Sequence, residues 1–197
     1  MEYSQCGYLK IILGPMFAGK TSELIRIHQT YLRSVGENAI AVINYADDKR
    51  YDNKDKVEYI VTHDKQKLPS LSFYNLINFI DGINLSKYQV ILINEGQFFQ
   101  DLYTVVDLLV NKYKKKVYVC GLDGDYKRQK FGDILDLISL ADDVVKLKSI
   151  CTKCKNNAIF THRIFKKNDN QYLIGDTIYE PLCRNCYNIL NPTNLDN

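Results

Sequence analysis

A glycine-rich octapeptide near the start of the chain has the spacing of a phosphate-binding loop. The residues Gly14, Pro15, Met16, Phe17, Ala18, Gly19, Lys20 and Thr21 fit the pattern G-x-x-x-x-G-K-[ST]. In this pattern backbone N–H groups surround phosphate oxygens, the lysine reaches the outer phosphates, and the threonine hydroxyl can bind Mg²⁺. The octapeptide predicts binding of a nucleoside triphosphate such as ATP, against the alternative of a tight glycine turn without a ligand. It does not identify a phosphoryl acceptor.

Two C-x-x-C pairs lie near the other end of the chain. Cys151 pairs with Cys154, and Cys183 with Cys186. Each pair can place two thiolates on one side of a tight turn, so two pairs complete a tetrahedral four-sulfur zinc site. The alternatives are two disulfides or a redox pair. Because four thiolates leave no open coordination position, we expect this zinc to be structural.

Glu95 is the carboxylate best placed for acid-base chemistry. It follows the apolar run Val90 to Ile93, and a carboxylate at the end of a parallel strand would lie near the phosphates. There it could accept the proton of an attacking hydroxyl. The alternative is an ordinary surface glutamate.

The elements around these motifs alternate between apolar strands and amphipathic helices. Strands are expected at 9–13, 39–43, 90–93 and 117–120, with a helix from Thr21 to Gly36 and another carrying Leu102 to Val110. Residues 45–67 are polar and read as a long loop. This pattern predicts an α/β P-loop (RecA-like) fold: a mostly parallel sheet flanked by helices at 1–148, a small zinc-binding β lasso domain at 149–190, and a flexible tail at 191–197.

Composition excludes several classes of protein. The formal charge is only +3 and the pI about 8.4, too mild to predict nucleic-acid binding. No uninterrupted apolar stretch is long enough to span a membrane. We therefore expect a soluble, cytoplasmic protein, in the host cytoplasm if the chain is viral.

Several motifs, taken in order, resemble the zinc-containing thymidine kinases of cells and viruses. They are GPMFAGKT, YADDKRY, THD, NEGQFF, GLDGDYKRQKFG and the paired C-x-x-C, which together cover the chain from about Leu9 to Cys186. The resemblance implies ATP-dependent phosphorylation of the 5′-hydroxyl of thymidine, and also of deoxyuridine, for deoxynucleotide salvage and DNA synthesis. It also implies a homotetramer that responds to the triphosphate product.

The resemblance assigns roles to individual residues. Glu95 matches the general base, and Lys20 and Arg50 match groups that support the transferring phosphoryl group. Nucleotide and magnesium contacts match the octapeptide 14–21 together with Asp48, Asn94 and Gln97. Nucleoside contacts match Met16, Phe99, Leu122, Tyr126, Phe131, Thr161, Leu173 and Tyr179.

The chain departs from the family pattern at four places. Asn94 stands where the family usually has Asp, which predicts weaker metal affinity with retained catalysis. Tyr126 replaces the usual Phe, and the lasso sequence from Leu173 to Cys183 is one residue shorter. The segment 51–61 is longer than in compact members.

These departures keep other functions open. A deoxynucleoside kinase of altered or broader base preference is motivated by Tyr126 and the shortened lasso. A zinc-ribbon nucleic-acid-binding ATPase is a second alternative, which the weak basicity disfavours. A nucleotide-binding protein that has lost catalysis is a third, suggested by Asn94 alone.

Overall fold

The computed structural model describes residues 6–46, 58–62, 65–165, 170–173, 175 and 177–192. Its main sheet has seven strands in the order β3-β4-β2-β5-β6-β1-β7. The strands are β1 (Tyr8–Leu13), β2 (Ile40–Tyr45), β3 (Glu58–Val61), β4 (Lys67–Phe73), β5 (Val90–Ile93), β6 (Lys116–Gly121) and β7 (Asp143–Lys146). All pairings are parallel except the antiparallel pairing of β3 with β4. The expected parallel sheet is therefore confirmed.

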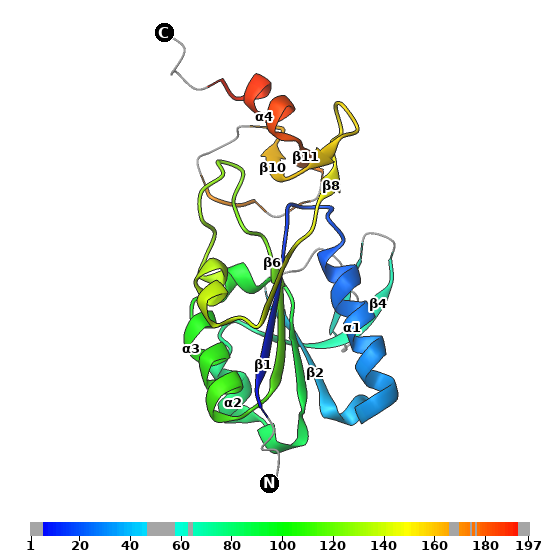
Figure 1. Ribbon diagram of the computed structural model, residues 1–197, viewed down its shortest axis with the longest axis vertical. Helices are drawn as coiled ribbons and strands as arrows, with labels where there is room; N and C mark the ends of the chain where they lie inside the picture. Colours follow the sequence, from blue (N-terminus) through cyan, green and yellow to red (C-terminus); the bar gives the residue numbers. More distant parts are fainter. Residues whose placement is uncertain are drawn as a thin grey trace.

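Helices cover both faces of this sheet (Figure 1). They are α1 (Lys20–Val35), α2 (Ile77–Gly82), α3 (Leu102–Asp107), the π-helix η4 (Leu108–Lys112), and the 3₁₀ segments η1 (Glu37–Ala39), η2 (Leu85–Lys87), η3 (Gly96–Phe98) and η5 (Ile134–Leu140). The buried apolar residues of α1 pack with one face of the strands, and those of α3, η4 and η5 pack with the other. Each face thus has its own core, as expected for strands that are apolar on both sides.

The region 45–67 differs from the expectation of a loop. Residues 58–61 form strand β3, and β4 begins at Lys67, with Tyr59 opposite Pro69 in the register. Exposed and half-buried residues make up β4, and Ile60 is the one buried residue of β3. β3 is an edge strand of the sheet and β4 is the strand next to it. Pro69 lies before the residues of β4 that pair with β2, Leu71 to Phe73, and a proline is tolerated where one side of a strand is unpaired.

The four cysteines lie in a small lobe at one end of the sheet (Figure 1). The cysteine lobe, residues 149–190 as far as the structure describes them, contains two two-stranded antiparallel sheets and one short helix. These elements are β8 (Ser149–Ile150), β9 (Asn157–Ala158), β10 (Phe160–Arg163), β11 (Tyr179–Leu182) and α4 (Arg184–Leu190). The β character expected between the cysteine pairs is confirmed.

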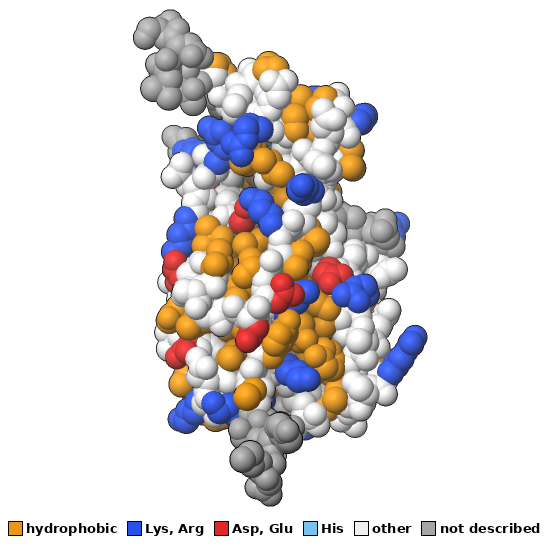
Figure 2. Space-filling view, in the orientation of Figure 1, with side chains coloured by type: hydrophobic (Ala, Val, Ile, Leu, Met, Phe, Trp, Pro, Cys, Tyr) orange, Lys and Arg blue, Asp and Glu red, His pale blue; other side chains and the backbone are white. Residues whose placement is uncertain are grey.

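The surface is consistent with the composition. Figure 2 shows Lys and Arg side chains scattered over the visible face, without a continuous basic patch. Within the described residues, every helix is too short or too polar to cross a bilayer.

Candidate active site

The octapeptide forms a phosphate-loop conformation between β1 and α1. Gly14 and Gly19 have φ values of 149° and 79°, and Phe17 is also left-handed at 63°. At Gly14 a Cβ atom would lie 2.8 Å from the carbonyl oxygen of Leu147, so only glycine fits there. Lys20 is buried, and its Nζ donates a hydrogen bond of 2.8 Å to the carbonyl oxygen of Pro15. The lysine therefore already faces the concave side of the loop.

Thr21 contacts the end of β5 through a chain of neutral polar groups. Its hydroxyl donates to Oδ1 of Asn94 at 3.4 Å, and the Cys120 thiol donates to the same oxygen at 3.1 Å. Asn94, only 3% exposed, donates from Nδ2 to Oδ1 of Asn44 at 2.9 Å. The sequence analysis missed Asn44, which lies fifty positions away on β2. Cys120 is buried as expected, and its thiol takes part in this network.

Glu95 follows β5 directly and has a left-handed backbone, with φ 53° and ψ 43°. Its carboxylate accepts a hydrogen bond of 2.7 Å from Nε2 of Gln97. The Gln97 side chain is 3% exposed, and its Oε1 accepts from the backbone N–H of Leu122 at 3.0 Å. The loop after β6 is thereby connected to Glu95 through one buried amide.

An aromatic cluster follows Glu95 in the chain. Its ring after β5 is Phe98, whereas the predicted nucleoside contact is the next residue, Phe99. Phe99 is fully buried in the core and does not line an open surface. Its neighbour Phe98 is half-buried and lies with its ring centroid 5.3 Å from Phe131 and 5.0 Å from Tyr172. Phe98 also stacks on Tyr45 at 5.2 Å. Phe98 and Tyr172 are thus aromatic candidates that the sequence analysis missed.

A buried arginine joins the predicted nucleoside residues of the cysteine lobe. Arg163 is 2% exposed, and its guanidinium carbon lies 3.7 Å from the ring centroid of Tyr126. It donates to the hydroxyl of Tyr179 at 3.2 Å, and the same hydroxyl accepts from the backbone N–H of Leu173 at 2.8 Å. The sequence analysis did not single out Arg163, because a lone arginine in a strand is usually exposed.

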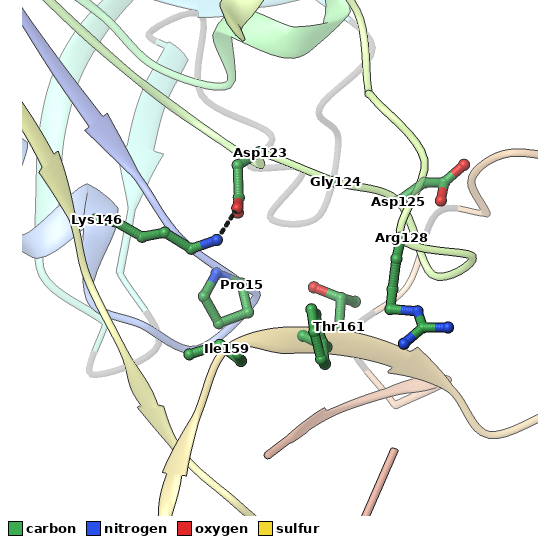
Figure 3. Close-up of a pocket in the computed structure, with 9 residues that line it drawn as sticks. Pro15, Asp123, Gly124, Asp125, Arg128, Lys146, Ile159 and Thr161 are labelled. Carbon is green, nitrogen blue, oxygen red and sulfur yellow. Dashed lines mark hydrogen bonds and ion pairs between the residues drawn. The ribbon is translucent and has the colours of Figure 1, made fainter. Parts of the chain in front are cut away.

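The phosphate loop and the cysteine lobe touch directly. The backbone N–H of Met16 donates to Oγ1 of Thr161 at 3.1 Å, and the Ser149 hydroxyl donates to the carbonyl oxygen of Phe17 at 3.0 Å. A polar hollow of about 180 Å³ lies where they meet, lined by Pro15, Asp123, Gly124, Asp125, Arg128, Lys146, Ile159, Phe160 and Thr161 (Figure 3). The ion pair between Asp123 and Lys146 closes one side of it. Nucleoside candidates therefore come from both parts of the chain.

The four cysteines predicted to bind zinc lie together, with their sulfur atoms all within 4.8 Å of one another. Burial opposes ionisation of Cys151, but hydrogen bonds with the backbone of Cys183, Cys154 and Lys153 lower the pKa of its thiol to about 6. Hydrogen bonding to Cys154 and burial raise the pKa of Cys186 to about 12. Four such crowded sulfurs become thiolates together when a divalent cation binds, so the cluster fits structural zinc.

Two predicted residues lie outside the described part of the chain. They are Asp48 and Arg50, the proposed acidic and arginine contacts to the phosphates. The remaining candidates gather around the carboxyl ends of β1, β5 and β6 and the adjoining lobe. In parallel α/β folds, ligands bind at the carboxyl ends of the strands. The fold and site therefore define a P-loop nucleotide-binding protein with a tetracysteine lobe.

Comparison with known proteins identifies the family. A thymidine kinase family profile matches residues 7–187. A thymidine kinase of Oryza sativa subsp. japonica is 40% identical over 92% of this chain and 66% of its own length. The thymidine kinases of sheeppox virus and Yaba monkey tumor virus are 35% and 38% identical over 95% of this chain and 98% of theirs. The chain belongs to the thymidine kinase family.

Membership of the family makes the chain an ATP-dependent enzyme of thymidine phosphorylation, and it does not favour the alternative functions. Among solved structures, domain III of the Thermotoga maritima replication initiation protein DnaA has a TM-score of 0.43 at 14% identity, covering 74% of this chain and 57% of that chain. That likeness is too distant to inform function.

Proposed function

We propose that the chain transfers the γ-phosphoryl group of ATP to the 5′-hydroxyl of thymidine with Glu95 as the general base. The 5′-oxygen forms a bond to the γ-phosphorus while the bond from that phosphorus to the bridging oxygen breaks. ADP leaves with the bond electrons, and the hydroxyl proton passes to the Glu95 carboxylate. The observation that supports this assignment is the partly buried hydrogen bond from Gln97 to Glu95, which follows β5 at the carboxyl end of the sheet, where the phosphate loop also lies.

Lys20 supplies positive charge to the phosphates. In the structure its ammonium group donates to the carbonyl oxygen of Pro15 within the loop. On ATP binding, phosphate oxygens take the place of that carbonyl as acceptors. Phosphoryl transfer depends on such positioning and charge more than on covalent help. Asp48 and Arg50 keep the roles that the family resemblance gives them.

Mg²⁺ fits the oxygen donors next to Lys20. The Thr21 hydroxyl and the Asn94 carboxamide oxygen lie 3.4 Å apart, and hard cations of this kind prefer oxygen ligands. Thr21 would hold the ion directly, and Asn94 would hydrogen-bond a water in its shell. When bound, Mg²⁺ would neutralise phosphate charge. Asn94 keeps the oxygen but supplies no formal negative charge.

The thymine base would lie between the aromatic cluster and the cysteine lobe. Half-buried Phe98 offers a ring surface, and the buried Phe131 packs against it, with Met16 and Leu122 at the phosphate side. Tyr126 borders the lobe, and Thr161 lies within it on β10. In the lobe, Leu173 and Tyr179 would fix the backbone that reads the edge of the base. We substitute Phe98 for Phe99 in this set because Phe99 is fully buried in the core.

Deoxyuridine as a second acceptor and a homotetrameric assembly follow from the family resemblance. A cytoplasmic location, and the division into domains at 1–148 and 149–190 with a tail at 191–197, follow from the composition and the pattern of elements. The absence of nucleic-acid and membrane partners belongs to the same proposal.

The test is a substrate panel with a base variant. Purified protein is incubated with ATP, Mg²⁺ and thymidine, deoxyuridine or deoxycytidine, and the products are separated by chromatography. Glu95→Gln is expected to lose about 10² to 10⁴-fold in kcat, while the exposed Glu37→Gln retains full activity. Comparable turnover of deoxycytidine would overturn the acceptor, and an active Glu95→Gln would overturn the base.

A further inference from the structure

Gln97 is bonded at both ends of its carboxamide. Its Oε1 accepts from the Leu122 backbone N–H at 3.0 Å, and its Nε2 donates to Oε2 of Glu95 at 2.7 Å. A backbone N–H can only donate and an ionised carboxylate can only accept. The amide orientation is therefore determined by its neighbours, and the NH₂ end must face Glu95.

The slot around Gln97 tolerates no additional atoms on two sides. A Cβ at Gly121 would lie 2.3 Å from the Gln97 Oε1, and a Cβ at Gly132 would lie 2.0 Å from its backbone oxygen. Gly132 is also left-handed, with φ 59°. Because both the side chain and the backbone of Gln97 are tightly surrounded, its carboxamide has little freedom to rotate or shift.

The Glu95 backbone adds a second constraint on the carboxylate. A left-handed conformation is unfavourable for glutamate, and such strain is commonly retained at functional sites. This conformation turns the chain sharply after β5 and fixes the position of the Glu95 Cα and Cβ atoms. Gln97 then holds one oxygen of the Glu95 carboxylate in a fixed direction.

We propose that Gln97 is a positioning residue that orients the Glu95 carboxylate and couples it to the nucleoside pocket, and that it is not a nucleotide contact. The proposal rests on the proposed role of Glu95 as general base. The coupling runs through Leu122, whose backbone N–H donates to Gln97 and whose side chain is a predicted nucleoside contact. The loop after β6 would thus both contact the nucleoside and orient the Glu95 carboxylate through Gln97.

The chemistry predicts a specific pH effect. A donated hydrogen bond favours the charged form of a carboxylate. Gln97→Met keeps the length but removes both the donor to Glu95 and the acceptor for the Leu122 N–H, so Glu95 takes up a proton at higher pH. Gln97→Glu keeps the shape and the acceptor for Leu122 but places a second carboxylate against Glu95. Two adjacent carboxylates share a proton, which moves the acidic limb of activity further upward.

The experiment measures kcat and KM for thymidine and for ATP from pH 5.5 to 9. The enzymes compared are wild type, Gln97→Met, Gln97→Glu, Glu95→Gln and the exposed Gln100→Glu as a charge control. Both Gln97 variants are expected to lose about 10 to 100-fold in kcat at pH 7, with the KM for ATP within about threefold because ATP loses no contact. The acidic limb shifts upward by about one pH unit in Gln97→Met and further in Gln97→Glu. Gln100→Glu should follow wild type.

Thermal melting accompanies the assay, because a residue that only stabilises the fold would lower Tm without moving the pH profile. Profiles of the Gln97 variants that coincide with wild type would overturn the positioning role. A loss confined to KM for ATP would overturn it in favour of nucleotide binding. Full activity of Glu95→Gln would instead refute the proposed function itself, so the two failures are distinguishable.

Discussion

The nucleotide-binding part and the cysteine lobe are stabilised in different ways. Strand β5 of the main sheet is fully buried along its length, and the two cores on either side of the sheet contain large apolar side chains from several helices. Within the described residues, the buried cluster of the lobe is small: Cys151, Ala158, Leu182, Cys183 and Tyr187. Two of these five residues are zinc-ligand candidates. The lobe therefore lacks the apolar burial that stabilises the rest of the chain.

The proposed phosphate contacts and nucleoside contacts therefore depend on parts of the chain that are stabilised differently. The phosphate loop depends on β1 and α1, which belong to the large cores. The lobe depends on sulfur ligation and on a few polar contacts, such as the one between Met16 and Thr161. Small domains with little core commonly rely on a metal in this way. Damage to the lobe should therefore remove thymidine recognition before it removes ATP binding.

Loss of the zinc site is expected to have the largest effect in this comparison. Cys183→Ser removes one ligand and the buried sulfur that accepts from the backbone N–H of Cys186. We expect zinc content to fall below stoichiometric and thymidine phosphorylation to fall by more than about 100-fold, because structural zinc supplies folding free energy. Binding of a fluorescent ATP analogue should change by less than about threefold, since the phosphate loop is intact.

The control for this variant is Cys6→Ser, which replaces an exposed cysteine outside the cluster. It should match wild type in zinc content and turnover. Equal loss of ATP and thymidine binding in Cys183→Ser would show that the two parts fold as one unit and would contradict the comparison.

Arg163 offers an intermediate perturbation inside the lobe. Arg163→Met removes the guanidinium from Tyr126 and from the Tyr179 hydroxyl. A desolvated cation–π contact is worth about 2 kcal/mol and a hydrogen bond to a charged group about 1.5 to 3 kcal/mol. Removing the buried charge also removes its desolvation cost, which offsets part of this loss. The free energy of unfolding should therefore fall by about 2 to 4 kcal/mol. Thymidine KM should rise by about tenfold because the backbone at Leu173 loses its support.

Arg128→Met is the matched control. Its guanidinium also lies over a tyrosine ring, 4.7 Å from the centroid of Tyr187, but the side chain is exposed. Contacts of that kind contribute about 0.5 to 1 kcal/mol. The free energy of unfolding in denaturant and the KM for thymidine are measured for both variants. Equal effects of the two substitutions would mean that burial of Arg163 does not strengthen its contacts.

The sequence predicts the parts of the site that are local. The octapeptide, the apolar strands and the two C-x-x-C pairs each combine residue type with short spacing, so their structures follow from nearby residues. The position of Glu95 at the end of β5 follows from the apolar run before it. The four-sulfur cluster also follows, because each pair brings its own turn.

Contacts between distant segments could not be predicted in the same way. Nothing in the spacing of Phe98 and Phe99 indicates which ring faces the lobe, since a 3₁₀ turn intervenes after β5. Asn44 and Asn94 meet because β2 and β5 are neighbours in the sheet, a fact of topology. Arg163 is buried against Tyr126, which comes from the distant loop after β6. Strand β3 is short and lies at an edge, so its pattern is weak.

Substitutions in the Asn44–Asn94 pair are expected to have the smallest effect, which should be confined to Mg²⁺ dependence and stability. Asn94→Asp adds a negative charge 3.4 Å from the Thr21 hydroxyl, so the Mg²⁺ concentration for half-maximal activity should fall by about threefold. The gain in Mg²⁺ affinity is limited because the new charge is buried. The Asn44 amide must also rotate so that its NH₂ group can donate to the new carboxylate. The same burial should cost about 1 to 3 kcal/mol of stability. kcat at saturating Mg²⁺ should stay within about twofold, since Glu95 and Lys20 are unchanged.

Asn44→Asp is the matched control, because it adds the same charge to the same buried pair while Thr21 keeps Asn94 as its acceptor. Mg²⁺ titrations of wild type and both variants, at saturating ATP and thymidine, separate the two positions. If only Asn94→Asp shifts the titration, the charge must adjoin Thr21 to act on the metal. Equal Mg²⁺ dependence of wild type and Asn94→Asp would contradict the prediction and would mean that Asn94 acts on Thr21 alone.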